Sequence, residues 1–146
     1  MDEINVLGLS QGALLARYIV ESCPIKGKVR QWASIGGPNM GVAQIPHCTG
    51  TGPVCGFING ITQDLVYTSL IQNTVGPAGY FRDSKNYYWY LEASGMLVHL
   101  NNEIANEEGF DERKQRFSAL NGALLVKFTE DTMIIPKESA WFWEID

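Results

Sequence analysis

The sequence predicts an α/β protein with a parallel sheet, and three segments near the start of the chain carry that prediction. Residues 4–9 form a short apolar run, too abrupt for a helix, which indicates a buried parallel strand. Residues 11–21 are apolar nearly all round and predict a helix, which ends at Cys23-Pro24 because proline supplies no amide. Residues 29–35 predict the next strand. Strand, helix and strand in succession form a βαβ unit with a right-handed crossover.

The middle of the chain, residues 40–121, has no regular strand pattern. Helical pieces are expected there, residues 63–72 and 113–120 among them. Residues 123–128 restore an apolar strand, and a polar loop follows it. We therefore expect a parallel sheet flanked by helices, with a mostly helical insertion between two of its strands.

This pattern divides the chain into three parts of one incomplete α/β domain. Residues 1–42 hold the first βαβ unit, residues 43–121 form the insertion, and residues 122–146 hold the later strand and the segment after it. The helix at 11–21 is so apolar that we expect the sheet and neighbouring helices to cover it on several sides.

Composition argues against several classes of protein. The 146 residues are 45% hydrophobic and 18% charged, which suits one globular domain rather than a disordered chain. The net charge of −5 and the lack of a Lys/Arg run argue against a nucleic-acid partner. No apolar stretch is long enough to predict a transmembrane segment, and residues 1–5 do not resemble a signal peptide.

The segment Gly8-Leu9-Ser10-Gln11-Gly12 matches the pattern G-x-S-x-G at the join between the first predicted strand and its helix. That setting is typical of the nucleophile elbow of an α/β-hydrolase, where a tight turn holds a serine out at the end of a strand. Glycine at both flanking positions is expected to avoid clashes with the strand and the helix. The amide of Gln11, at the helix N-terminus, would face negative charge developing on a substrate oxygen. The alternative is an incidental serine in a Gly-rich turn.

A serine nucleophile needs a base, and the base needs an acid to orient it. In α/β-hydrolases the partners follow in the order serine, acid, histidine. Asp131 is the natural candidate for the acid because it comes just after a predicted apolar strand. Glu130 is adjacent, and spacing alone does not choose between them. Either residue could also be an ordinary loop carboxylate.

The two histidines do not fit this order. His47 lies in a Pro/Cys-rich loop and His99 in the insertion, and both precede Asp131. We expect structural or surface roles for both. The chain ends at Asp146 without a closing turn, so we expect a truncated chain that supplies no catalytic histidine and is inactive alone.

Three cysteines leave one without a partner inside the chain. Cys48 and Cys55 are close enough in sequence to close a small loop by a disulfide, which would leave Cys23 unpaired. Three reduced thiols are an equally good interpretation of the spacing.

Several blocks of the sequence, taken in order, resemble the palmitoyl-protein thioesterases, particularly those of plants and protists. The resemblance covers nearly all the chain and is far more specific than the pentapeptide alone. Its blocks are 5–12 (NVLGLSQG), 34–42 (SIGGPNMGV), 45–48 (IPHC), 100–103 (LNNE), 126–132 (VKFTEDT) and 135–142 (IPKESAWF).

The resemblance implies roles for particular residues. It places the nucleophile on Ser10 and the acid on Asp131 rather than Glu130. One oxyanion donor would be the amide of Gln11, and a second would come from a loop upstream of this chain. Gly8 and Gly12 would be the elbow glycines, completing the motif.

The resemblance also implies a disulfide between Cys48 and Cys55, with the partner of Cys23 lying upstream. It further implies lysosomal location after entry into the secretory pathway, although this chain contains no signal peptide. The catalytic histidine would fall beyond Asp146. No metal or organic cofactor is expected.

The implied reaction is hydrolysis of a fatty-acyl thioester on cysteine, so the expected partners are S-acylated proteins or other acyl thioesters. The groove for the acyl chain would lie in the insertion; alternatively, the same side chains fill the core of the insertion. They are Leu65, Val66, Leu70, Ile71 and the aromatic residues Tyr80, Phe81, Tyr87, Tyr88, Trp89 and Tyr90. The alternatives to a thioesterase are a lipase or esterase on the same scaffold, a non-catalytic acyl-binding protein, and a truncated product without function.

Overall fold

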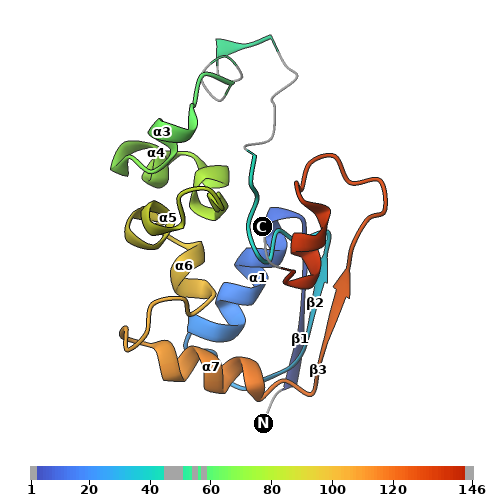
Figure 1. Ribbon diagram of the computed structural model, residues 1–146. Coiled ribbons are helices and arrows are strands. Elements are labelled where there is room, and N and C mark those ends of the chain that lie inside the picture. Colours follow the sequence, from blue (N-terminus) through green and yellow to red (C-terminus); the bar gives the residue numbers. More distant parts are fainter. Residues whose placement is uncertain (1–2, 45–50, 54–55, 57–58, 144–146) are drawn as a thin grey trace.

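The computed structural model of the protein describes residues 3–44, 51–53, 56 and 59–143 (Figure 1). Its centre is a parallel sheet in the order β1-β2-β3, made of β1 (Glu3–Leu9), β2 (Lys28–Ile35) and β3 (Gly122–Val126). Leu7 pairs with Ala33, which pairs with Leu124, so the carboxyl ends of all three strands lie at one edge. The predicted parallel sheet is confirmed. The third strand ends at residue 126, two residues before the predicted end at 128.

Helix α1 (Gln11–Ser22) connects β1 to β2 across one face of the sheet, as the predicted βαβ unit requires. Ala16 and Val20 of α1 pack on Trp32, the largest fully buried side chain among the described residues. Val6 and Leu125 border the same cluster from the two outer strands. These apolar contacts hold the helix over the centre of the sheet.

Helix α7 (Phe110–Ser118) packs beside α1 and contributes Phe117 to the same cluster. The rings of Phe117 and Trp32 meet edge to face, with 5.7 Å between their centroids. The helix begins at residue 110 rather than at the predicted 113, directly after Gly109, whose φ of +80° suits glycine at the end of a loop. Acidic residues in the first turn and Arg116 in the last turn interact favourably with the helix dipole and stabilise the helix.

The opposite face of the sheet carries apolar side chains that no described residue covers. Leu7 and Leu124 are 64% and 59% exposed on that face. Leu15 and Tyr18 of α1 are also about half exposed, at 56% and 48%. The described helices therefore flank the sheet on one side. Helix α1 is covered by the sheet, by α7 and by the insertion, as expected, except at its outward-facing residues.

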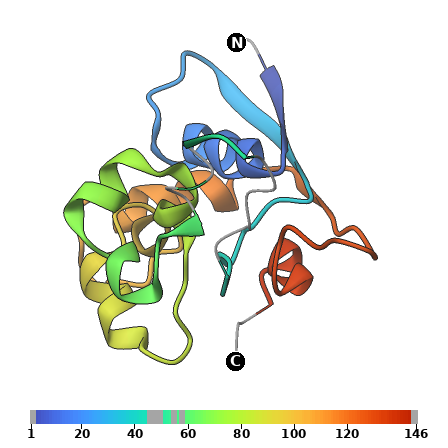
Figure 2. The ribbon, with the colours of Figure 1, turned by 90° about the horizontal axis from the view of Figure 1, so that it is seen from above.

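The insertion is mostly helical, as predicted, and Figure 2 shows it on the side of α1 away from the sheet. The predicted helical segment at 63–72 is broken at Tyr67 and Thr68. Leu14 of α1 and Val42 belong to the apolar core of the insertion, which attaches it to the rest of the fold. Besides α7, the described helices of the insertion are α3 (Gln63–Val66), α4 (Ser69–Thr74), η1 (Gly76–Tyr80), α5 (Tyr87–Ala93) and α6 (Leu97–Leu100).

The aromatic residues of the insertion divide between core and surface. The buried ones are Tyr80, Phe81 and Tyr90, and the exposed ones are Tyr87, Tyr88 and Trp89. In the buried part, Glu103 accepts a hydrogen bond from the Tyr90 hydroxyl and pairs with Arg82 at 2.8 Å. Burial, followed by the charge of Glu103, raises the pKa of Tyr90, so the phenol stays protonated and donates.

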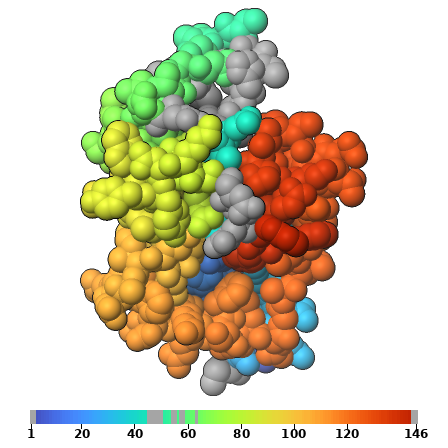
Figure 3. Space-filling model, in the orientation of Figure 1, coloured from blue at the N-terminus to red at the C-terminus, as the bar shows by residue number. Residues whose placement is uncertain are grey.

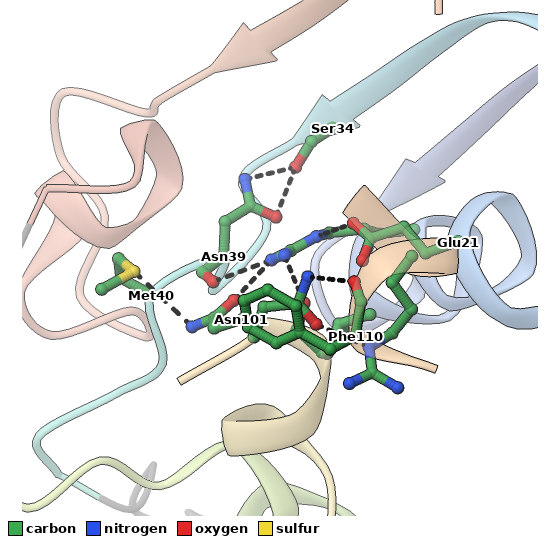
Figure 4. Close-up of polar contacts among 10 residues, drawn as sticks. Glu21, Ser34, Asn39, Met40, Asn101 and Phe110 are labelled. Atoms are coloured by element: carbon green, nitrogen blue, oxygen red, sulfur yellow. Dashed lines mark hydrogen bonds and ion pairs between the residues drawn. The ribbon is translucent and has the colours of Figure 1, made fainter. Parts of the chain in front are cut away.

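Arg17, a buried cation, joins α1 to other segments of the fold; Figure 4 labels its partners Glu21 and Asn101. Arg17 is 6% exposed and pairs with Glu21, one helical turn later, at 2.6 Å. Its guanidinium also donates to the side-chain oxygen of Asn101 and to the carbonyl of Leu100, each at 2.6 Å. The ring of Phe142 lies 4.8 Å from the same group. These contacts bind α1 to the insertion and to the C-terminal segment.

The loop after β2 is fastened to the C-terminal segment, which contains η2 (Lys137–Trp141). The amide of Asn39 donates to the carbonyl of Ala140 at 2.9 Å. The backbone amide of Met40 donates to the carbonyl of Ser139 at 3.2 Å. In the space-filling view, the insertion and the C-terminal segment leave only a small part of α1 visible between them (Figure 3).

Arg17→Ala is expected to lower the free energy of unfolding by about 3–5 kcal/mol, because it leaves the Glu21 carboxylate buried without its cation. The matched control is Arg30→Ala, which removes an exposed ion pair with Glu3 and should cost at most about 1 kcal/mol. Urea unfolding followed by circular dichroism measures both changes. Equal losses would show that the buried pair contributes no more than the exposed one.

Candidate active site

Ser10 lies in a strained turn between β1 and α1. Its φ of 52° and ψ of −129° are rare for a residue with a side chain and cost about 1–3 kcal/mol. Two backbone hydrogen bonds hold the turn: Ser10 donates to the carbonyl of Ile35 at 2.8 Å and accepts from the amide of Ala13 at 2.9 Å. The serine is exposed, and its side chain makes no capping hydrogen bond to α1.

The two glycines of the motif are in different steric situations. A Cβ on Gly8 would lie 2.3 Å from the carbonyl oxygen of Gly12 and 2.4 Å from the Cα of Ala13, so only glycine fits there. A Cβ on Gly12 would meet no atom within 4 Å among the described residues. The expectation that both glycines avoid a clash therefore holds for Gly8 and is wrong for Gly12 within the described structure.

Gln11 is the first residue of α1, so its backbone amide is among those that a helix leaves without an internal partner. That position suits the predicted oxyanion donor. The Gln11 side chain lies against the insertion, because a Cβ on Gly76 would come within 2.6 Å of its Nε2 atom. The start of η1 therefore reaches the turn that carries Ser10.

The end of β2 lies between β1 and β3 and is followed by two glycines. Gly36 has a φ of +55°, and a Cβ there would lie 2.4 Å from the ring of Phe128. A Cβ on Gly37 would lie 2.4 Å from the Cβ of Ala13. The ring of Phe128 and the Cβ of Ala13 therefore already occupy the space beside these two glycines.

Asp131 lies in the loop after β3, and its carboxylate is held by backbone amides. The Oδ1 atom accepts from the amides of Met133 at 2.8 Å and Ile134 at 3.0 Å. The Oδ2 atom has no hydrogen-bond partner among the described residues, so it remains free to accept one. The neighbouring Glu130 is exposed and makes no such contact in the described part of the chain.

The two candidate residues come to the same edge of the sheet. Ser10 follows β1 and Asp131 follows β3, and both strands run parallel to β2. One strand therefore separates the serine from the carboxylate. An imidazole that bridges them would have to span the end of β2.

His99 and Cys23, which the structure describes, belong to other parts of the fold. His99 lies on α6, and its Nδ1 atom is 2.6 Å from Oε2 of Glu107. Cys23 is half-buried and unpaired among the described residues. His47 and the expected disulfide between Cys48 and Cys55 lie outside the described residues.

The expected acyl groove is only partly compatible with the packing. Val66 and Ile71 belong to the core of the insertion, as the alternative interpretation of these residues held. Leu65 and Leu70 point outward and are 47% and 67% exposed. Only the outward-facing residues remain available for an acyl chain.

Arg17 is a supporting residue that the sequence analysis did not single out. It is the one charged side chain between Gln11 and Val20, in a run that is otherwise almost entirely apolar. A charged residue within a run of residues that must be buried indicates that the folded protein supplies an ion-pair or hydrogen-bond partner for it.

The described part of the chain has neither a membrane-spanning helix nor a cluster of metal ligands. No helix there is both long and apolar enough to cross a membrane. No three acidic, histidine or cysteine side chains there gather as metal ligands would.

The parallel sheet flanked by helices, with a strained turn and an exposed serine between β1 and α1, defines an α/β protein. The comparison with protein families gives a narrower result: residues 1–146 match the family described as palmitoyl protein thioesterase. The chain belongs to the palmitoyl-protein thioesterase family.

Individual relatives agree with the family. The chain is 32% identical to palmitoyl-protein thioesterase 1 of Caenorhabditis elegans, over 94% of this chain and 45% of that protein. It is 34% identical to the palmitoyl-protein thioesterase-dolichyl pyrophosphate phosphatase fusion 1 of Schizosaccharomyces pombe, over 93% of this chain and 22% of that protein. It is 29% identical to lysosomal thioesterase PPT2-B of Xenopus laevis, over 95% of this chain and 47% of that protein. The chain thus spans less than half the length of these relatives.

Substituting the two motif glycines by alanine is expected to have opposite effects on stability. Gly8→Ala should cost at least about 1–3 kcal/mol, because the new methyl group meets backbone atoms that cannot move aside. Gly12→Ala should add about 0.4–1 kcal/mol, because the site is open and helical. Urea unfolding of both variants compares them directly. Loss of stability in Gly12→Ala as large as in Gly8→Ala would contradict this steric account.

Proposed function

We propose that Ser10 and Asp131 are the nucleophile and the acid of a thioesterase that removes long-chain fatty acyl groups from S-acylated cysteines. The observation that carries the proposal is the strained, exposed conformation of Ser10 at the sheet edge to which Asp131 also belongs. Membership of the palmitoyl-protein thioesterase family supports the class of substrate.

In the proposed reaction, the Ser10 hydroxyl attacks the carbonyl carbon of the thioester while a histidine takes its proton. The amide of Gln11 stabilises the negative charge that develops on the carbonyl oxygen. The cysteine thiolate then leaves with that proton, and an acyl group remains on Ser10. Water, activated by the same histidine, releases the fatty acid and restores the serine.

Asp131 would orient that histidine through the free Oδ2 atom. The two backbone amides on Oδ1 keep the carboxylate in place, and they support Asp131 over Glu130 as the acid. His99 is not proposed as the base, because it already pairs with Glu107 on the insertion.

The insertion would bind the acyl chain through its outward-facing apolar side chains. Burial of about ten methylene groups contributes roughly 8 kcal/mol, so a long chain would dominate affinity. Leu65 and Leu70 are available for such contacts, whereas Val66 and Ile71 are committed to the core.

The proposed location is the lysosome. It is supported by the name of the Xenopus relative, a lysosomal thioesterase. Fluorescence microscopy of the protein in its native cells would test this, and exclusion from compartments that carry a lysosomal membrane marker would refute it.

Asp131→Asn is expected to lower kcat for a palmitoyl-cysteine peptide about 10³–10⁴-fold, because an amide holds the wrong imidazole tautomer. The matched control is Glu130→Gln, which changes the adjacent exposed carboxylate and should alter kcat less than about twofold. Steady-state kinetics on the longest native form of the protein provide the measurement. An equal loss in both variants, or a loss in the control alone, would exclude Asp131 as the acid.

A further inference from the structure

The end of β2 and the loop that follows it, residues 36–43, lie between the two parts of the candidate site. On one side, the backbone amide of Ser10 donates to the carbonyl of Ile35, the last residue of β2, at 2.8 Å. On the other side, the backbone amide of Gly36 donates to the carbonyl of Val126, the last residue of β3, at 2.7 Å. This part of the chain therefore contacts both the turn that carries the serine and the strand that leads to the candidate acid.

Hydrogen bonds near both ends of this loop join it to the segment that follows Asp131. The backbone amide of Ala43 donates to the carbonyl of Ile135 at 2.7 Å. Closer to β2, the side-chain amide of Asn39 donates through Nδ2 to the carbonyl of Ala140 at 2.9 Å. The place of the acid-bearing segment relative to β2 therefore depends on these contacts.

Asn39 is a fully buried amide that is held from two further directions. Its Nδ2 atom also donates to the hydroxyl of Ser34 on β2 at 3.0 Å, a contact that Figure 4 shows. Its backbone carbonyl accepts from the guanidinium of Arg17 on α1 at 3.4 Å. A buried polar group that loses its partners is costly, so the Asn39 side chain is confined to this one position.

The loop beside Asn39 packs directly on the first turn of α1. A Cβ on Gly37 would lie 2.4 Å from the Cβ of Ala13 and 2.4 Å from the hydroxyl oxygen of Ser34. Ala13 is buried, and its amide donates to the carbonyl of Ser10. Asn39 therefore connects a region packed against the serine-bearing turn to the C-terminal segment.

We propose that Asn39 is a positioning residue for the candidate site, whose side-chain amide fixes the loop that carries Asp131 relative to the turn that carries Ser10. The inference rests on the proposed thioesterase function, because Asn39 acts through Asp131. A displacement of about 1 Å in a catalytic group can cost about 10²-fold in rate. The Asn39 side chain is fully buried and does not contact the substrate, so its loss should lower kcat rather than raise KM.

The test is a double-mutant cycle with Asp131 on the longest native form of the protein. Asn39→Ala should lower kcat for a palmitoyl-cysteine peptide about 10–100-fold and change KM less than about threefold. In Asp131→Asn, which has already lost the orienting carboxylate, the same substitution should lower kcat less than about twofold. A merely structural role would lower kcat by the same factor in both backgrounds.

The matched control is Asn102→Gly, because Asn102 also joins two segments through its side chain. It donates to the carbonyl of Phe110 at 3.1 Å and accepts from Arg113 at 2.8 Å. Its φ of 53° is one that glycine adopts without strain. This substitution should change kcat less than about twofold in both backgrounds.

Ser34→Ala is a milder variant, because it removes one partner of the Asn39 amide and keeps the bond to Ala140. It should lower kcat about three- to tenfold, again only where Asp131 is present, and it tests the inference if Asn39→Ala does not fold.

Equal losses of kcat with and without the Asp131 carboxylate, or a loss in Asn102→Gly as large as in Asn39→Ala, would overturn the inference. Full activity of Asp131→Asn alone would refute the proposed function. A large loss in Asp131→Asn, with an effect of Asn39→Ala that simply multiplies it, would refute only the positioning role of Asn39.

Discussion

The buried guanidinium of Arg17 is the contact on which the geometry of the candidate site depends. α1 begins directly after Ser10, and Arg17 lies about two turns further along it. From there it binds Asn101 of the insertion and stacks near Phe142 of the C-terminal segment. A buried charge without partners costs several kcal/mol. Moving these segments apart would leave the guanidinium without its partners, so its contacts hold them together. Arg17 thus joins the insertion and the C-terminal segment to the helix that begins after Ser10.

Parallel pairing supplies the second constraint. Because β1 and β3 both run parallel to β2, the residues that follow them emerge at one edge, although 121 positions separate Ser10 from Asp131 in the sequence. Strain at Ser10 is tolerated because the bond to Ile35 and the first turn of α1 fix its backbone. Gly76, at the start of η1, lies against the side chain of Gln11, so the insertion contacts the residue that follows Ser10.

Secondary structure could be predicted from the sequence where the local pattern of apolar residues determines it. The strands, the crossover helix and the position of Ser10 between them could be predicted, because a buried strand and an apolar helix have distinct periods. The break between α3 and α4 could not, since Tyr67, between them, is buried against Phe81 and accepts a hydrogen bond from the amide of Asp83. Nor could the role of Arg17, because its partners lie in segments distant in sequence. The exposure of Leu7 and Leu124 could not be predicted either, because an apolar pattern does not show which face of a strand remains uncovered.

The most direct test of the central claim is to treat the longest active form of the protein with an alkyl fluorophosphonate and to locate the adduct by peptide mass spectrometry. The account predicts one adduct, on Ser10, that forms at the rate at which palmitoyl-thioester hydrolysis is lost. Loss of hydrolysis with the adduct on another residue, or full hydrolysis after complete modification of Ser10, would contradict it.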